Sequence, residues 1–164
     1  MINLMDFFLN MENYTIIKID PNFPRFNIGK DDIDVLCLNI NNVCNHIINI
    51  LQLKYPDFNY KKYNINNKIH IDVLFKNKFI IKFDLCDNIV DLYPKYDIPT
   101  NLTKSVIETS IFNKYHCKIP TINNELMIRQ LEYDTYINSR PDKIKHLIFI
   151  KKHSNILYKK FNKI

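Results

Sequence analysis

The sequence has one glycine, no tryptophan and no long hydrophobic run. A helix that spans a bilayer needs about 18 or more consecutive, mostly apolar residues, and no window of this chain approaches that length. The first residues, MINLMDFFLNMEN, carry Asp6 and Glu12 and no early Lys or Arg, unlike a secretory signal or a transit peptide. These absences favour a cytoplasmic protein that acts without a membrane.

Cysteine motifs that bind metal are also missing. None of the four cysteines forms a CxxC pair, and no Cys/His group has the spacing of a zinc site. Cys37, Cys44 and Cys86 lie in apolar segments, where free thiols are usually buried. We therefore expect buried thiols and no zinc site.

What the chain does have is a core-forming composition and uneven charge. Its 164 residues are 46% hydrophobic, which suits one domain with a proper core. Residues 1–50 hold three Lys or Arg and six Asp or Glu, whereas residues 140–164 hold eight and one. The two ends could face one polyanionic ligand together, with metal between acids and phosphate. The alternative is a solvated basic helix at the C-terminal end.

The spacing of apolar residues predicts five strands, of which the last three are joined by short links that favour an antiparallel meander. The predicted strands cover 14–19, 33–38, 58–65, 69–75 and 78–85. Together with the helices, they predict an α+β fold with a mixed, largely antiparallel β-sheet and helices packed on it. We expect a single domain over 1–164, with the sheet core in about 1–100 and a helical part in about 101–164.

Helices are predicted on both sides of the strand-rich segment. A short one is expected over 2–12, and a longer one over about 43–54, where Asn41 or Asn42 can form the N-cap. Residues 88–100 are predicted to be a loop. Further helices are expected over about 101–113, along NNELMIRQLEYDTY, and from Pro141 onward. On the last helix, one apolar face is predicted from Ile144, Leu147 and Ile148.

The stretch GKDDIDVLCLN, residues 29–39, places carboxylates at the mouth of an apolar strand, although aspartate is disfavoured in strands. Residues i and i+2 of a strand point to the same face. Asp32 and Asp34 therefore project together, while Asp31 would point away, with Ile33, unless the strand begins after it. Two carboxylates so placed can share a divalent cation, Mg²⁺ or Mn²⁺, with the phosphates of a nucleotide.

A third acid usually completes such a site, and two strand aspartates downstream are candidates. Asp72 shares a face with His70, and Asp84 shares one with Lys82. At least one of the two is expected to pair with a lysine on a neighbouring strand instead. Asp72 is nearer to Asp34 in sequence and is preferred as the third metal ligand, while Asp84 stays a candidate catalytic acid.

These features together resemble a known family. They are the segment YTIIKIDPNFPRFNIGKDDIDVLC, a helix, a strand with a further aspartate, and ELMIRQLEY…RPDKIKHL within residues 125–147. This arrangement is similar to the nucleotidyltransferase superfamily with a polymerase β-like catalytic core. Within that superfamily, the chain most resembles small members found beside glycan and capsule genes.

The resemblance implies transfer of a nucleoside monophosphate from an NTP, such as ATP, to an acceptor hydroxyl on a glycan precursor or small molecule. Asp32 and Asp34 would hold Mg²⁺, and the third acid would help activate the acceptor. Cationic groups would then bind the phosphates, and Arg129 could instead pair with Glu125 at i−4. The phosphate-binding candidates are Lys18, Arg25, Lys30 and Lys143, with Lys145 and His146 in addition.

The chain departs from the family pattern at one point. Many members carry Gly-Ser at a helix N-terminus, where backbone N–H groups bind phosphate, and this chain has only Gly29. A catalytically degenerate binding module and a LicD/fukutin-like phosphotransferase therefore stay open. A nucleic-acid-binding module is less favoured, because the aromatic residues follow core periodicity.

Two other metal-binding classes fit poorly. A glycosyltransferase with a DxD motif needs a nucleotide-binding half before the motif, and too few residues precede Asp32. An EF-hand loop needs a glycine at its sixth position and a glutamate at its twelfth, and this stretch has neither.

Overall fold

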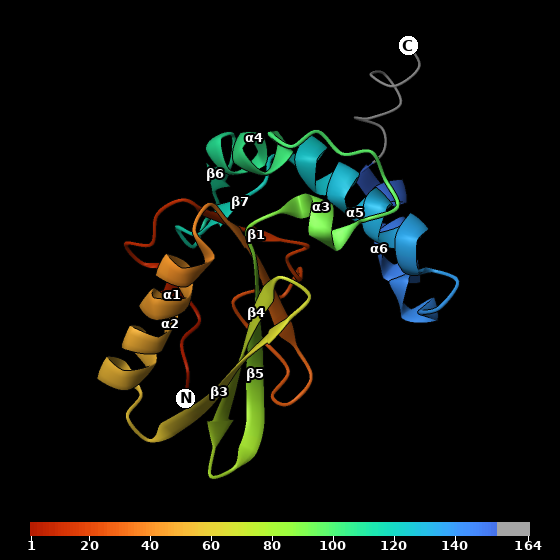
Figure 1. Cartoon of the computed structure of the whole chain (residues 1–164). Coiled ribbons are helices and arrows are strands. Elements are labelled where there is room, and N and C mark those ends of the chain that lie inside the picture. The colour runs from red at the N-terminus through yellow and green to blue at the C-terminus, as the bar shows by residue number, and fades with distance from the viewer. Residues whose placement is uncertain (154–164) are drawn as a thin grey trace.

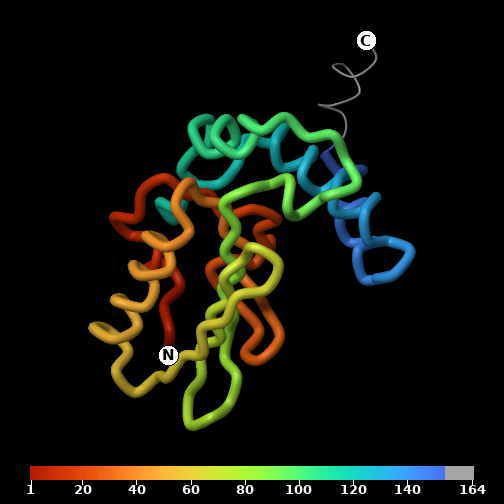
Figure 2. Tube along the Cα trace, in the orientation of Figure 1, coloured from red at the N-terminus to blue at the C-terminus, as the bar shows by residue number. Residues whose placement is uncertain are grey.

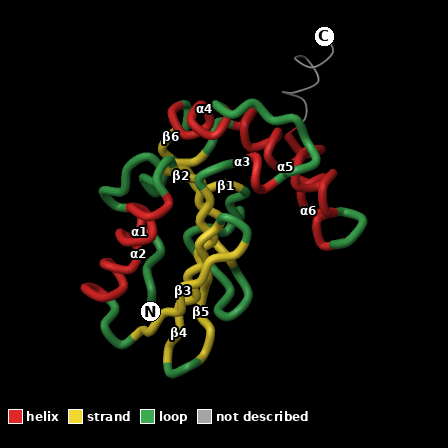
Figure 3. Tube along the Cα trace, viewed as in Figure 1, coloured by secondary structure: helices red, strands yellow, loops and turns green. Residues whose placement is uncertain are grey.

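The computed structural model describes residues 1–153, and the last part of the expected helical region, 154–164, lies outside the described residues. A five-stranded sheet forms the centre of the molecule (Figures 1 and 3). Its strands, in spatial order, are β1 (Tyr14–Ile17), β2 (Asp32–Cys37), β5 (Lys78–Cys86), β4 (Lys68–Phe75) and β3 (Phe58–Ile65).

Strands β3, β4 and β5 form the antiparallel meander that the sequence predicts. Their two-residue links, Asn66-Asn67 and Lys76-Asn77, have positive φ at both positions, as tight hairpin turns require. The β2–β5 pair is parallel, and α2 (Ile40–Lys54) lies in the crossover between them. The predicted α+β class and the mixed, largely antiparallel sheet are confirmed.

The two faces of the sheet are covered differently. On one face, alternate residues of the meander pack with α1 (Met5–Phe8) and α2 in the larger core cluster. On the other face, Ile17, Leu36 and Cys86 pack at one end of the sheet in a second cluster. Residues of α3 (Ile89–Leu92), α4 (Leu102–Glu108) and α5 (Ile122–Tyr136) complete that cluster, and Figure 2 shows these segments gathered at that end.

The remaining elements extend the helical part. After the 3₁₀ turn Pro141–Lys143, α6 (Ile144–His153) packs against α5. A small two-stranded sheet, β6 (Ile111–Phe112) and β7 (Lys118–Ile119), lies between α4 and α5 in the chain. All four cysteines are buried and free. Within residues 1–153, none of the helices combines the length and apolarity that a membrane span requires.

Several helix predictions need correction. Helix α2 begins three residues earlier than predicted, because the side chain of Asn39 accepts a hydrogen bond from the backbone N–H of Asn42 at 3.0 Å. The helix expected over 2–12 is the single turn α1, and the one expected over 101–113 ends at Glu108. The predicted loop 88–100 contains α3.

The apolar face predicted for the last helix is wrong. Ile144 and Ile148 are 45% and 62% exposed, whereas His146 and Ile150 are buried. Helix α6 therefore turns a histidine toward the interior of the molecule, and this side chain bears on the candidate site.

Candidate active site

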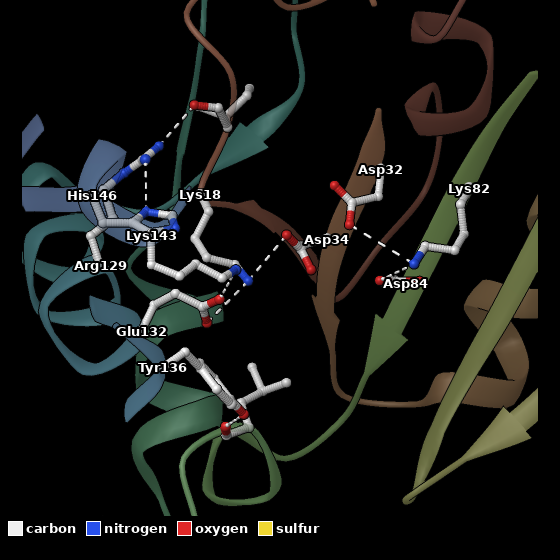
Figure 4. Close-up of polar contacts among 12 residues, drawn as sticks. Lys18, Asp32, Asp34, Lys82, Asp84, Arg129, Glu132, Tyr136, Lys143 and His146 are labelled. Atoms are coloured by element: carbon white, nitrogen blue, oxygen red, sulfur yellow. Dashed lines mark hydrogen bonds and ion pairs between the residues drawn. The ribbon is translucent and has the colours of Figure 1, made fainter. Parts of the chain in front are cut away.

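On the sheet face opposite α1 and α2, the part that the second core cluster does not cover carries two rows of polar side chains. In one row, Asp34 of β2 is opposite Asp84 of β5, which is opposite His70 of β4. In the next row, Asp32 is opposite Lys82, which is opposite Asp72. The parallel alignment of β2 and β5 thus places carboxylates from two strands side by side. Figure 4 shows Asp32, Asp34 and Asp84 around one opening.

Asp32, Asp34 and Asp84 form the acidic cluster of this site. One carboxylate oxygen from each lies within 4.8 Å of the others, and within residues 1–153 this is the one group of three such ligands. Burial and the nearby Asp34 carboxylate raise the pKa of Asp84, while Lys82 and His70 act in the opposite direction. The most buried acid of the cluster therefore holds a proton more readily than an ordinary aspartate.

Asp72 is not part of this cluster, although the sequence analysis preferred it as a metal ligand. It lies on the same face, one row away, and its carboxylate accepts hydrogen bonds from the Tyr63 hydroxyl at 3.1 and 3.2 Å. The structure places Asp84 in the position of third acid. His70 is next to it, with Nδ1 2.6 Å from the Asp84 Oδ1 atom.

Two lysines neutralise the acidic cluster. Lys82 Nζ lies 3.0 Å from Asp84 Oδ2 and 3.9 Å from Asp32 Oδ2. Lys18 Nζ lies 3.1 Å from Asp34 Oδ2. Burial alone would lower the pKa of Lys18, but Asp34, Tyr93 and Glu132 hold it well above its usual value. Both side chains are therefore cations at neutral pH.

The cluster fits a divalent metal ion in its donor chemistry. Hard oxygen ligands from two or three carboxylates, completed by phosphate and water, are what Mg²⁺ and Mn²⁺ prefer. Burial, and after it the Asp34 carboxylate, raises the pKa of Asp84, and a divalent cation would offset the repulsion between these two carboxylates. Lys82 is a quarter exposed, so its long side chain has room to move aside.

A buried chain of charges connects the acidic cluster to the helices. Lys18 Nζ also lies 3.4 Å from Glu132 Oε2 of α5, and Glu132 in turn accepts a hydrogen bond from Lys143. Burial would raise the pKa of Glu132, but the two ammonium groups lower it to about 2. Lys18 and Lys143, predicted to bind phosphate, have side chains that are only 10% and 8% exposed and are already paired with carboxylates.

A second buried group lies beside this chain. Arg129 donates from Nε to Glu125 Oε1 at 2.6 Å and from Nη2 to the Ile19 carbonyl oxygen at 2.8 Å. Glu125 Oε2 accepts from the backbone N–H of Lys18, whose φ of 53° is in the left-handed region. The predicted Glu125–Arg129 pair is present, and it holds the end of β1 against α5.

His146 completes this second group. Arg129 Nη1 lies 3.3 Å from His146 Nδ1, and a dashed line in Figure 4 marks this contact. Burial and the Arg129 cation lower the pKa of His146 to about 3, although Glu132 acts in the opposite direction. The imidazole is therefore neutral at pH 7.

Members of these groups line one cleft of about 330 Å³. Asp32, Asp34 and Asp84 line it from the sheet, and Glu132 and His146 line it from the helices. Four further cations with exposed or half-buried side chains also line it, and they come from four different segments: Arg25, Lys68, Arg140 and Lys145.

The sequence predicts some of these residues and gives no signal for others. Of the cations predicted to bind phosphate, Arg25 and Lys145 line the cleft, whereas Lys30 is exposed and does not line it. Glu132 and Arg140 were missed, because each is one charge among many on a helix or turn. Glu132 contacts Lys18, which is far away in the sequence, so no local pattern indicates this contact.

Comparisons with known proteins add little to this geometry. No protein-family model matches the sequence, and no curated protein matches it significantly. Among solved structures, the Megavirus polyadenylate synthase is similar with a TM-score of 0.41 and 13% identity, over 88% of this chain and 29% of that one. The chain therefore spans less than a third of that protein.

Proposed function

We propose that this protein is a nucleotidyltransferase that moves a nucleoside monophosphate from an NTP to an acceptor hydroxyl. One observation carries the proposal: ligand oxygens of Asp32, Asp34 and Asp84 lie within 4.8 Å of one another and line a cleft that exposed or half-buried cations also line. Three carboxylates with hard oxygen ligands suit a divalent metal, and the cations suit a polyphosphate. The resemblance of the DxD segment to nucleotidyltransferases agrees with this reading.

In the proposed reaction, Asp32, Asp34 and Asp84 hold Mg²⁺ or Mn²⁺, with Asp84 in the place first expected for Asp72. When bound, the metal neutralises charge on the phosphates and polarises the oxygens attached to it. The acceptor oxygen forms a bond to the α-phosphorus, and the bond from that phosphorus to the bridging oxygen of pyrophosphate breaks. An oxygen of the Asp84 carboxylate takes the hydroxyl proton.

The cations divide into two roles in this proposal. Arg25, Lys68, Arg140 and Lys145 line the cleft and bind the triphosphate. Lys18 and Lys143 instead position the site, because Lys18 contacts Asp34 and both are paired with Glu132. Phosphate binding by Lys30 stays a prediction, because Lys30 does not line the cleft.

The acceptor is proposed to be a small molecule or a glycan precursor, with a nucleic acid as the less favoured alternative. A cytoplasmic location, which the sequence analysis favours, would supply ATP and other NTPs together with Mg²⁺. A LicD/fukutin-like phosphotransferase would use the same acidic cluster with a different donor.

The test is thermal unfolding of the protein with each of the four NTPs and with Mg²⁺ or Mn²⁺. A ligand at 100 times its Kd stabilises the folded state by about 2.7 kcal/mol, which a melting curve resolves. We expect metal-dependent stabilisation by at least one NTP, and its loss in Asp32→Asn/Asp34→Asn and in Asp84→Asn. Asp72→Asn is the matched control, because it removes a carboxylate from the same sheet face outside the cluster and should respond like wild type. If no NTP stabilises the wild type with either metal, the proposal is wrong.

A binding module without chemistry is the second candidate, and the lysines favour it. Lys82 Nζ and Lys18 Nζ lie 3.0 Å from Asp84 and 3.1 Å from Asp34, so two of the three carboxylates already have cationic partners within the protein. Pyrophosphate release, measured with a panel of hydroxyl acceptors, separates the two candidates. A module that binds NTP and releases no pyrophosphate would match this second function.

A further inference from the structure

His146 is a buried polar side chain with one ring nitrogen unpartnered. It is 2% exposed and lines the cleft. Its Nδ1 atom faces Arg129, while Nε2 is buried and has no hydrogen-bond partner among residues 1–153. A buried polar atom without a partner destabilises the folded state, so this arrangement needs a reason.

The contact with Arg129 determines where the imidazole proton is. A guanidinium group has N–H donors and no acceptor, so the His146 Nδ1 atom, 3.3 Å from Arg129 Nη1, must be the acceptor. The imidazole is neutral at pH 7, as its lowered pKa indicates. Its single proton is therefore on Nε2. The atom without a partner is a hydrogen-bond donor.

The charges around His146 are already balanced in pairs. Glu125 pairs with Arg129, and Glu132 is shared by Lys18 and Lys143, with Asp34 as the second partner of Lys18. Three cations thus face three carboxylates. Among these buried groups, the one polar atom still without a partner is the neutral His146 Nε2 donor, which suits an uncharged acceptor such as a carbonyl, ring nitrogen or hydroxyl oxygen.

We propose that His146 Nε2 donates a hydrogen bond to the nucleoside part of the bound NTP. This inference rests on the proposed function and assigns the helix side of the cleft to the nucleoside. The triphosphate extends from there to the acidic cluster and the exposed cations. Aromatic side chains of Phe23, Phe26 and Tyr136 line the same cleft, and such rings stack on nucleobases.

The test compares two ligands and two variants by titration calorimetry in the presence of Mg²⁺. The ligands are the NTP that binds wild type best and inorganic tripolyphosphate, which has the same phosphates and no nucleoside. His146→Asn keeps an acceptor near Nδ1 for Arg129 and loses the donor at Nε2. His146→Gln reaches the Nε2 position and keeps a donor there.

We expect His146→Asn to weaken NTP binding roughly tenfold, the loss of one buried hydrogen bond, and to leave tripolyphosphate binding unchanged. His146→Gln should bind NTP within about threefold of wild type. The inference is wrong if His146→Asn binds NTP like wild type, or if it weakens both ligands equally. A wild type that binds tripolyphosphate and NTP equally also overturns it. If wild type binds neither ligand, the proposed function itself fails, and the inference with it.

Discussion

At the scale of single residues, Glu132 is a buried carboxylate that contacts two lysines. Its carboxylate is buried between the ammonium groups of Lys18 and Lys143, and Lys18 is also in contact with Asp34. Buried ions are tolerated only when their partners compensate the lost hydration. Glu132 therefore holds two cations in the interior and keeps Lys18 in place beside the acidic cluster.

The first stability prediction concerns this residue. Glu132→Gln keeps the shape of the side chain and removes its charge, so two buried lysines lose their shared partner. Breaking a buried pair in this way costs about 3–5 kcal/mol, and we expect a loss of that size in urea unfolding at pH 7. Glu108→Gln is the matched control. Its partner Lys104 is 3.6 Å away and both side chains are more than half exposed, so the expected loss is below about 0.5 kcal/mol.

The pH dependence of the Glu132 effect has a definite sign. In the folded protein, the pKa of Glu132 is lowered from its ordinary 4.5 to about 2. A carboxylate with a lowered pKa stabilises the folded state above its unfolded pKa, and that stabilisation is lost as the pH falls through the folded value. The difference between wild type and Glu132→Gln should therefore be full above about pH 4.5 and shrink toward pH 2. A difference that does not change with pH would contradict the charge-based explanation.

At the scale of elements, the strands were predicted well because their signal is local. The meander 58–85 follows from alternating apolar residues and two short links, and the period of two places Asp32 and Asp34 on one face. The third acid could not be predicted in this way. Asp84 joins the cluster because β2 and β5 pair in parallel with Asp34 opposite Asp84, a register that no local pattern in either strand specifies.

The helices show the same division between local and non-local signals. The apolar spacing of α6 suggested that Ile144 and Ile148 would be buried, but α6 packs on α5 through other residues, including His146. The contacts of His146 with Arg129, and of Lys143 with Glu132, compensate for burying polar groups. Such contacts are visible only once the helices are placed together.

The element-scale prediction concerns the start of α2. Asn39 accepts a hydrogen bond from the Asn42 backbone N–H, so Asn39→Ala should destabilise the protein by about 1 kcal/mol, the usual value of an N-cap. The matched control is Asn41→Ala, in the first turn of the same helix. Alanine favours helix more than asparagine does, so the control should be neutral or slightly stabilising. Chemical denaturation of the two variants compares them directly, and equal losses would place the cap elsewhere.

At the scale of the whole molecule, the sheet and the helical part share their interior. The second core cluster combines Leu36 of β2 and Cys86 of β5 with Ile128 of α5. The Lys18–Glu132 pair and the Arg129 bond to the Ile19 carbonyl join the same two parts at the cleft. The cleft exists only where the two parts meet, so its geometry depends on their packing. A single domain over 1–164 stays a prediction, and these contacts favour it.

This shared interior predicts one cooperative unit, which hydrogen exchange can test. If the parts unfold together, the slowest amides of β4 and of α5 should exchange with the same free energy of opening.

Ile128→Ala removes a side chain from the second cluster, and Ile47→Ala removes one from the larger cluster, which includes residues of α2. Each should cost about 2–5 kcal/mol, and each should lower the protection of both elements by the same amount, because only global unfolding exposes them. If Ile128→Ala lowers protection in α5 and leaves β4 unchanged, the helical part opens on its own. The cleft would then be able to lose its helix side, with Glu132 and His146, while the acidic cluster stays folded on the sheet.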